Sequence, residues 1–230
     1  MNSKSVLLAG ATGLVGGLTL RRLLEKRDFA GAVFAPSRRE LGISDPRLVS
    51  VRMDFASAES ESPLVAAIGA HSARGLDAYV SCLGTTIKTA GSREAFIAVD
   101  RDLVLRLAQT AFGRGARHAI LVSSMGASRQ SGNFYLRVKG EIEDALEKIG
   151  FDRLDILQPG LLLGNRRERR PGEAIARTLA PLINPLMLGR LRRYRAIEAD
   201  AVARAIVHLL DSETGGLFTH DNDSIRELAG

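Results

Sequence analysis

The sequence has little cysteine, and its few histidines are scattered. Cys82 is the only cysteine in 230 residues, which excludes an internal disulfide framework and is typical of a reducing compartment. We therefore expect a cytoplasmic location. None of the four histidines stands at metal-ligand spacing from another histidine or from Cys82, so we expect no metal site. The histidines are His71, His118, His208 and His220.

Long apolar segments are also missing. The run Val6–Leu20 is too short to span a bilayer, and its regularly spaced glycines and the two arginines that follow argue against a signal peptide. Apolar residues make up 45% of the chain and charged residues 25%, which are ordinary values for a globular protein. We expect a single domain, residues 1–230, with no membrane association, as a monomer or homodimer.

The net charge of +6 comes almost entirely from one segment. Residues 166–195 hold nine arginines and only two glutamates, so the rest of the chain is close to neutral. A nucleic-acid reader would need stacking aromatics, and Tyr194 is the only aromatic residue there, so we expect no nucleic-acid partner. We assign the basic segment, within residues 161–195, to the substrate side or an oligomer surface. A solvated surface is the alternative.

The beginning of the chain is typical of a dinucleotide-binding unit. Val6–Ala9 predicts a buried parallel strand, Gly10, Gly13 and Gly16 follow three apart, and a helical pattern begins at Leu18. The free N–H groups of a helix N-terminus bind phosphate, and glycines let the backbone come close. The spacing differs from the commonest G-x-G-x-x-G fingerprint, so a turn that binds nothing is the alternative.

The second predicted strand, 31–35, leads into arginines rather than into a carboxylate. An acidic residue here would bind the ribose 2′-hydroxyl of NAD, whereas Arg38 and Arg39 suit the 2′-phosphate of NADP. The alternative is a solvated pair of arginines in a loop. We therefore favour NADPH as the cofactor.

Strands alternate with helices along the rest of the chain, which predicts an α/β fold with a doubly wound parallel sheet of Rossmann type and a small C-terminal elaboration. Ligands of such sheets bind at the carboxyl ends of the strands, where Asp54, Cys82 and Gly84 are placed. Asp54 either caps a turn or accepts from adenine, and Cys82 reads as a small buried hydrophobe. Further strands are predicted at 48–53, 78–83, 118–122, 154–157 and 216–219, and helices at 63–68, 96–112, 135–149, 173–179, 200–210 and from Ser224.

Two serines, a tyrosine and a lysine are placed by the sequence where they could take part in proton transfer. The fifth strand delivers Ser123 and Ser124 to the carboxyl edge, and Tyr135 and Lys139 follow four residues apart, on one helix face. A lysine ammonium beside a phenol stabilises the phenolate, which makes the tyrosine a usable general acid or base. A serine hydroxyl on the strand end would hold a carbonyl oxygen.

These motifs resemble the short-chain dehydrogenases/reductases of the atypical kind. The segments "GATGLVG", "SCLGTT", "VDRDLVL", "SSMGA" and "YLRVKGEIE", with "FDRLDILQPGLLLGNRRERRPGE", resemble the Tat-interacting-protein branch of NAD(P)H-binding oxidoreductases up to about Glu173. The resemblance implies Tyr135 as catalytic acid/base, Lys139 as ribose ligand that tunes the tyrosine, and Ser124 as carbonyl-orienting residue. The predicted cofactor contacts are Gly10, Thr12, Gly13, Leu14, Val15, Gly16, Arg38, Arg39, Asp54, Leu83, Gly84, Tyr135, Lys139, Leu162 and Arg170.

One residue departs from the pattern of the wider superfamily. Asp100 stands where many short-chain dehydrogenases carry an asparagine that supports a proton relay. A relay through Asp100 and simple N-capping of a helix turn are both open. The leading hypothesis is an NADPH-dependent reductase of a small carbonyl substrate. The alternative is an NADPH sensor that turns over little and acts on a protein partner.

Overall fold

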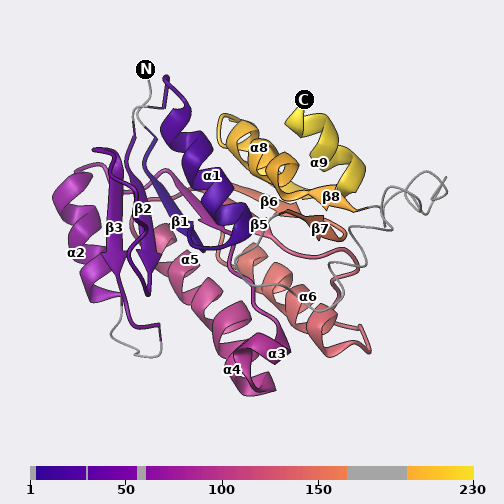
Figure 1. The fold of residues 1–230 in the computed structure, drawn as a ribbon. Coiled ribbons are helices and arrows are strands. Elements are labelled where there is room, and N and C mark those ends of the chain that lie inside the picture. The colour runs from indigo at the N-terminus through magenta and orange to yellow at the C-terminus, as the bar shows by residue number, and fades with distance from the viewer. Residues whose placement is uncertain (1–3, 30, 56–60, 165–195) are drawn as a thin grey trace.

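A parallel sheet forms the centre of the computed structural model, which describes residues 4–29, 31–55, 61–164 and 196–230 (Figure 1). Its strand order is β3-β2-β1-β4-β5-β6-β9, and every neighbouring pair is parallel. The order reverses between β1 and β4, which places the ligand crevice at their carboxyl ends. The doubly wound fold is confirmed. The strands are β1 Val6–Ala9, β2 Val33–Ser37, β3 Leu48–Arg52, β4 Ala78–Ser81, β5 His118–Val122, β6 Arg153–Leu157 and β9 Gly216–His220.

Helices cover both faces of the sheet (Figure 1). One face carries α1 Leu14–Glu25, α8 Ala199–Leu209 and α9 Asn222–Ala229, and the other carries α2 Ser62–His71, α5 Val104–Gly113 and α6 Phe134–Glu147. Each helix layer packs its apolar stripe on the sheet, which gives two hydrophobic cores, one on each side. The central strands β1 and β4 are buried along their whole length, as their unbroken apolar runs predict.

A second, very small sheet follows β6. It pairs β7 Leu162–Leu163 with β8 Ile197–Glu198 in parallel. The basic segment from 166 to 195, with Arg170 and the predicted helix 173–179, lies outside the described residues. None of the described helices is long and apolar enough to cross a membrane.

Two predictions about helices are wrong. The helix predicted at 96–112 begins earlier and has three parts, α4 Arg93–Ile97, a π-helical turn Ala98–Leu103 and α5, preceded by the short α3 Ile87–Ala90. The last helix does not begin at Ser224. Asp221 is its N-cap, because the Asp221 carboxylate accepts from the backbone N–H of Ser224 at 3.0 Å.

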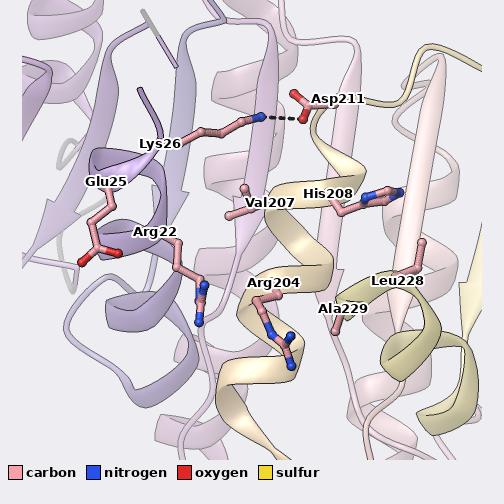
Figure 2. Close-up of a pocket in the computed structure, with 9 residues that line it drawn as sticks. All are labelled: Arg22, Glu25, Lys26, Arg204, Val207, His208, Asp211, Leu228 and Ala229. Carbon is pink, nitrogen blue, oxygen red and sulfur yellow. Dashed lines mark hydrogen bonds and ion pairs between the residues drawn. The ribbon is translucent and has the colours of Figure 1, made fainter. Parts of the chain in front are cut away.

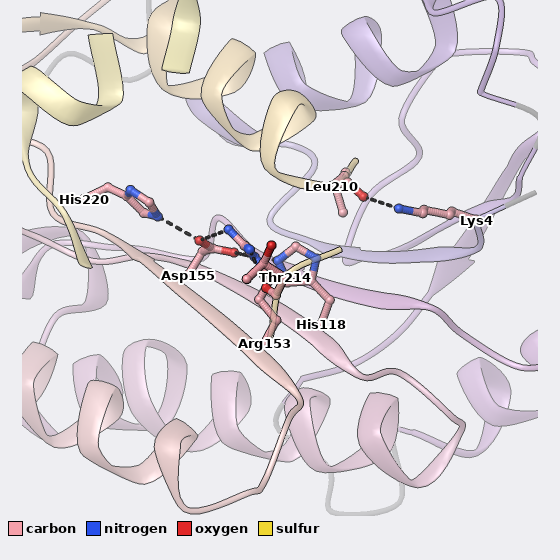
Figure 3. A network of polar contacts seen from close by, with 7 residues as sticks. All are labelled: Lys4, His118, Arg153, Asp155, Leu210, Thr214 and His220. Carbon is pink, nitrogen blue, oxygen red and sulfur yellow. Dashed lines mark hydrogen bonds and ion pairs between the residues drawn. The ribbon is translucent and has the colours of Figure 1, made fainter. Parts of the chain in front are cut away.

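A buried carboxylate joins three strands on the face covered by α8 and α9 (Figure 3). Asp155 of β6 accepts from Nε2 of His118 on β5 and of His220 on β9, both at 2.7 Å, and from Arg153 at 2.5 and 2.9 Å. Burial opposes ionisation of Asp155, but these hydrogen bonds outweigh it and hold the pKa of the carboxyl well below its usual range.

Candidate active site

The glycine turn after β1 is shaped by close backbone contacts. Gly10 has a φ of +85°, and a Cβ there would lie 2.7 Å from the carbonyl carbon of Cys82 at the end of β4. A Cβ on Gly16 would overlap the Gly10 carbonyl oxygen, so the helix lies directly on the turn. Gly13 is the N-cap of α1 and contributes no side-chain cap, and Thr12 beside it is exposed. This N-terminus therefore fits the pyrophosphate of a dinucleotide.

The first residues of α1 lie beside the segment that follows β6. A Cβ on Gly164 would come within 2.9 Å of the Leu14 side chain, and Leu162 packs on the same core as Leu14. Val15 is buried in this core. The structure thus places Leu14, in the first turn of α1, against Gly164, two residues after Leu162.

Two arginines follow β2 and are exposed to solvent. Arg38 and Arg39 stand directly after Ser37, whose hydroxyl donates to the Arg39 carbonyl oxygen at 2.6 Å and orders the start of the loop. Asp54 is exposed, two residues beyond the end of β3. All three lie past the carboxyl ends of their strands, on the side where an adenosine 2′-phosphate would be bound.

Tyr135 and Lys139 lie on one face of α6, as their spacing predicts. Asn133 caps this helix and accepts from the backbone N–H of Leu136. The Tyr135 ring is half-buried, stands 5.7 Å from the ring of Phe96, and has the Lys139 ammonium nitrogen 5.9 Å from its centre. Lys139 itself is buried. The tyrosine hydroxyl is thus carried by a helix whose first turn is fixed by a cap and by aromatic packing.

The carboxylate of Asp100 reaches the same place from the π-helical turn. Its Oδ1 lies 2.9 Å from the Lys139 ammonium, and its Oδ2 accepts from the backbone N–H of Thr85 at 2.8 Å. The N-capping alternative for Asp100 is wrong, because Asp100 lies inside the π-helical turn, whose N-cap is Ile97, and its carboxylate instead joins α6 to the loop after β4. Leu83 and Gly84 lie in that loop, where Leu83 is half-buried and Gly84 exposed.

The two serines that follow β5 have different surroundings. Ser123 is buried and its hydroxyl donates to Glu143 of α6, while Ser124 is half-buried one residue further on. Both carboxylate oxygens of Glu143 also accept from the Gln158 side chain at 3.0 Å. Burial raises the pKa of Glu143, although the two hydrogen bonds oppose that rise. Glu143 and Gln158 were missed from the sequence, yet Glu143 continues the four-residue spacing of Tyr135 and Lys139.

Cys82 packs on the core beside the glycine turn, as the sequence predicted. It is half-buried, and burial raises the pKa of its thiol to about 12. A neutral thiol of this kind is a poor nucleophile.

A surface groove of about 450 Å³ lies away from these residues, between α1, α8 and α9 (Figure 2). Its charged side chains are largely engaged with each other or with their neighbours. Lys26 binds Asp211 at 2.5 Å, and Arg22 binds Asp200 at 2.6 Å. Within the described residues, no group of three or more His, Cys, Asp or Glu side chains is arranged to hold a metal ion.

Comparison with known proteins identifies the family. The family model described as NAD(P)H-binding matches residues 10–213, which include the glycine turn, the Tyr135–Lys139 pair and Asp100. The chain belongs to this NAD(P)H-binding family. Its fold is that of solved short chain dehydrogenases, which the motifs of the sequence resemble.

Relatives of similar length support the assignment. The chain is 38% identical to the protein HTATIP2 of Rattus norvegicus over 77% of this chain and 70% of that protein. It is 36% identical to "Protein fmp52, mitochondrial" of Aspergillus clavatus, over 89% of this chain and 86% of that protein. A short chain dehydrogenase from Leptospira borgpetersenii, solved with bound NAD+, has the same fold, with a TM-score of 0.69, 15% identity and coverage of 97% and 93%.

The names of the fungal relatives overturn one expectation. Several of them are called mitochondrial, which contradicts the cytoplasmic location expected for this chain. The physical reason for the error is that a single free cysteine indicates a reducing environment and does not distinguish one reducing compartment from another.

Proposed function

We propose that this chain is an NADPH-dependent reductase of the short-chain dehydrogenase type, which acts on a small aldehyde or ketone. A bound nicotinamide would supply hydride to the carbonyl carbon. Tyr135 donates a proton to the carbonyl oxygen as it gains negative charge, Ser124 orients that oxygen, and Lys139 holds the cofactor ribose and supports the phenolate that Tyr135 becomes.

The observation that carries the proposal is the position of the Tyr135–Lys139 pair. The phenol and the ammonium lie at the start of α6, and Asp100 ties Lys139 to the loop after β4. That loop adjoins the glycine turn, since Gly10 approaches the backbone of Cys82 and Leu83. A cofactor bound at the turn would therefore reach the phenol along the same edge of the sheet.

The preference for NADPH rests on charge. Arg38 and Arg39 follow β2 where a carboxylate would select NAD, and both side chains are exposed and available to a phosphate. Guanidinium groups bind phosphate through paired, charge-assisted hydrogen bonds.

A cofactor sensor is the second candidate, and one contact favours it. Lys139 is ion-paired with Asp100, so its ammonium is already engaged by the protein itself. The reductase is nevertheless favoured over the sensor, because a protein that only reports on redox state has no need for a reactive phenol. As a sensor it would pass the signal to a protein partner.

The deciding experiment measures NADPH oxidation against a panel of aldehydes, ketones and quinones. We expect turnover in the parent and its loss in Tyr135→Phe, with NADPH binding retained. Tyr79→Phe is the matched control, because its hydroxyl bonds the Val104 carbonyl in the core at 2.9 Å and takes no part in the site. Tight NADPH binding without oxidation in any variant would refute the reductase and favour the sensor.

A further inference from the structure

Asp100 is a buried carboxylate with two partners on different elements. Its side chain is fully buried, and the Lys139 side chain that it contacts is 3% exposed. One oxygen binds the lysine ammonium and the other accepts from the Thr85 backbone N–H. Two charges out of contact with water are stable only when they are paired and hydrogen-bonded, so this geometry is strongly determined.

The loop after β4 passes directly over the ion pair. A Cβ on Gly84 would lie 3.8 Å from Oδ1 of Asp100 and 3.9 Å from the Lys139 ammonium nitrogen. Gly84 is exposed, so a ligand bound on this loop would be separated from the lysine only by the glycine backbone. Asp100 reaches the loop from a π-helical turn, a distortion that often accompanies functional sites in helices.

We propose that Asp100 is a positioning residue of the cofactor site, which holds the Lys139 ammonium against the Gly84–Thr85 loop so that lysine and loop meet the cofactor together. The inference rests on the proposed role of Lys139 as ribose ligand. A free lysine side chain has many rotamers, and fixing it before the cofactor arrives removes that cost from binding. Asp100 thus acts through Lys139 and touches neither cofactor nor substrate.

The test compares two ligands. NADPH reaches the lysine, whereas adenosine 2′,5′-bisphosphate lacks the nicotinamide and its ribose. Asp100→Asn keeps an acceptor for the Thr85 N–H but removes the charge. We expect Asp100→Asn to weaken NADPH binding by about 10-fold or more and to change the affinity for the bisphosphate by no more than about 2-fold. Asp102→Asn is the matched control, because Asp102 lies in the same turn, is 48% exposed and pairs with Arg101.

A general loss of structure would weaken the binding of both ligands equally, so equal losses of affinity would overturn the proposal. Unchanged NADPH affinity in Asp100→Asn would also overturn it. A double-mutant cycle then tests whether Asp100 acts through the lysine. In a Lys139→Gln background, Asp100→Asn should have no further effect on NADPH binding, and a further loss of about 10-fold would overturn the proposal. If Asp100→Asn alone fails to fold, the double variant, which buries no unpaired charge, is compared with Lys139→Gln, in which the Asp100 carboxylate lacks its counter-charge. A difference of about 10-fold in NADPH affinity between these two folded variants would overturn the proposal.

Turnover distinguishes this inference from the proposed function. A parent that binds NADPH but reduces no carbonyl compound refutes the reductase, while the comparison of the two ligands still decides the role of Asp100. In an active parent, Asp100→Asn should raise KM for NADPH more than it lowers kcat, and a fall in kcat alone would contradict a role in cofactor positioning.

Discussion

Replacing Asp155 by asparagine should strongly destabilise the protein. The carboxylate is fully buried and accepts four hydrogen bonds, from two histidines on the neighbouring strands and from Arg153 on its own strand (Figure 3). Asparagine keeps one acceptor oxygen and places an amide donor where the other oxygen stood. The guanidinium of Arg153 then loses its counter-charge in an environment that excludes water.

The size of the effect follows from that unpaired charge. Removing one partner of a buried ion pair costs about 3–5 kcal/mol, and we expect a loss of this size in the free energy of unfolding of Asp155→Asn. For a chain of this length, such a loss lowers the thermal midpoint by roughly 10 °C. Asp144→Asn is the control, because the Asp144–Arg129 pair spans 3.3 Å between side chains that are about half exposed, and exposed pairs contribute at most about 1 kcal/mol.

Urea unfolding at several pH values measures the effect and checks its cause. The pKa of Asp155 is lowered in the folded protein, so its ionised form stabilises the fold at neutral pH. This contribution is lost as the pH falls below about 4, where the unfolded carboxyl gains its proton first. The difference between parent and variant should therefore shrink on acidification. A loss no larger than that of the Asp144 control, or a difference that is constant with pH, would refute the reasoning.

Three further predictions concern the cofactor edge. Arg38→Ala with Arg39→Ala should weaken NADPH by about 10- to 100-fold and leave NADH nearly unchanged in a fluorescence titration, and equal losses would contradict a 2′-phosphate site. Gly16→Ala, which drives a Cβ into the glycine turn, should lower the free energy of unfolding by about 1–3 kcal/mol, whereas Gly69→Ala, with nothing within 4 Å, should be tolerated. Cys82 should be alkylated at neutral pH on the order of a hundred-fold more slowly than a free cysteine, because burial raises the pKa of its thiol to about 12 and the higher nucleophilicity of its thiolate offsets only part of that effect. Alkylation by iodoacetamide as fast as that of a free cysteine would contradict the raised pKa.

Much of the fold could be predicted from the sequence because the signals were local. An apolar run such as Val6–Ala9 before a glycine turn, or His118–Val122 after Gly115, indicates a buried parallel strand by composition alone. The residue at which the last helix begins could not be predicted from local signals in this way. Asp221 and Ser224 are both good caps, and the choice between them depends on how β9 delivers the chain.

The π-helical turn was not predictable because its cause lies elsewhere in the chain. A helical pattern over 96–112 is satisfied by a regular helix as well as by one with a π turn. The carboxylate of Asp100 meets Lys139 and Thr85, which are 39 and 15 residues away along the sequence. Contacts of this kind leave no periodic signal, and the same holds for Glu143, whose partners Ser123 and Gln158 directly follow two different strands, β5 and β6.

The site therefore has two halves that are built by different means. The half that we propose for the pyrophosphate is made of backbone, where Gly10 and Gly16 permit close approach, and such positions are visible in a sequence because no other residue fits. The other half is organised by one face of α6. Lys139 reaches the loop after β4 through Asp100, and Glu143 reaches the ends of β5 and β6. Tyr135, the proton donor that we propose, begins that face. The helix that carries it therefore also contacts three adjacent strand ends, and the phenol is held in place by contacts well outside its own turn.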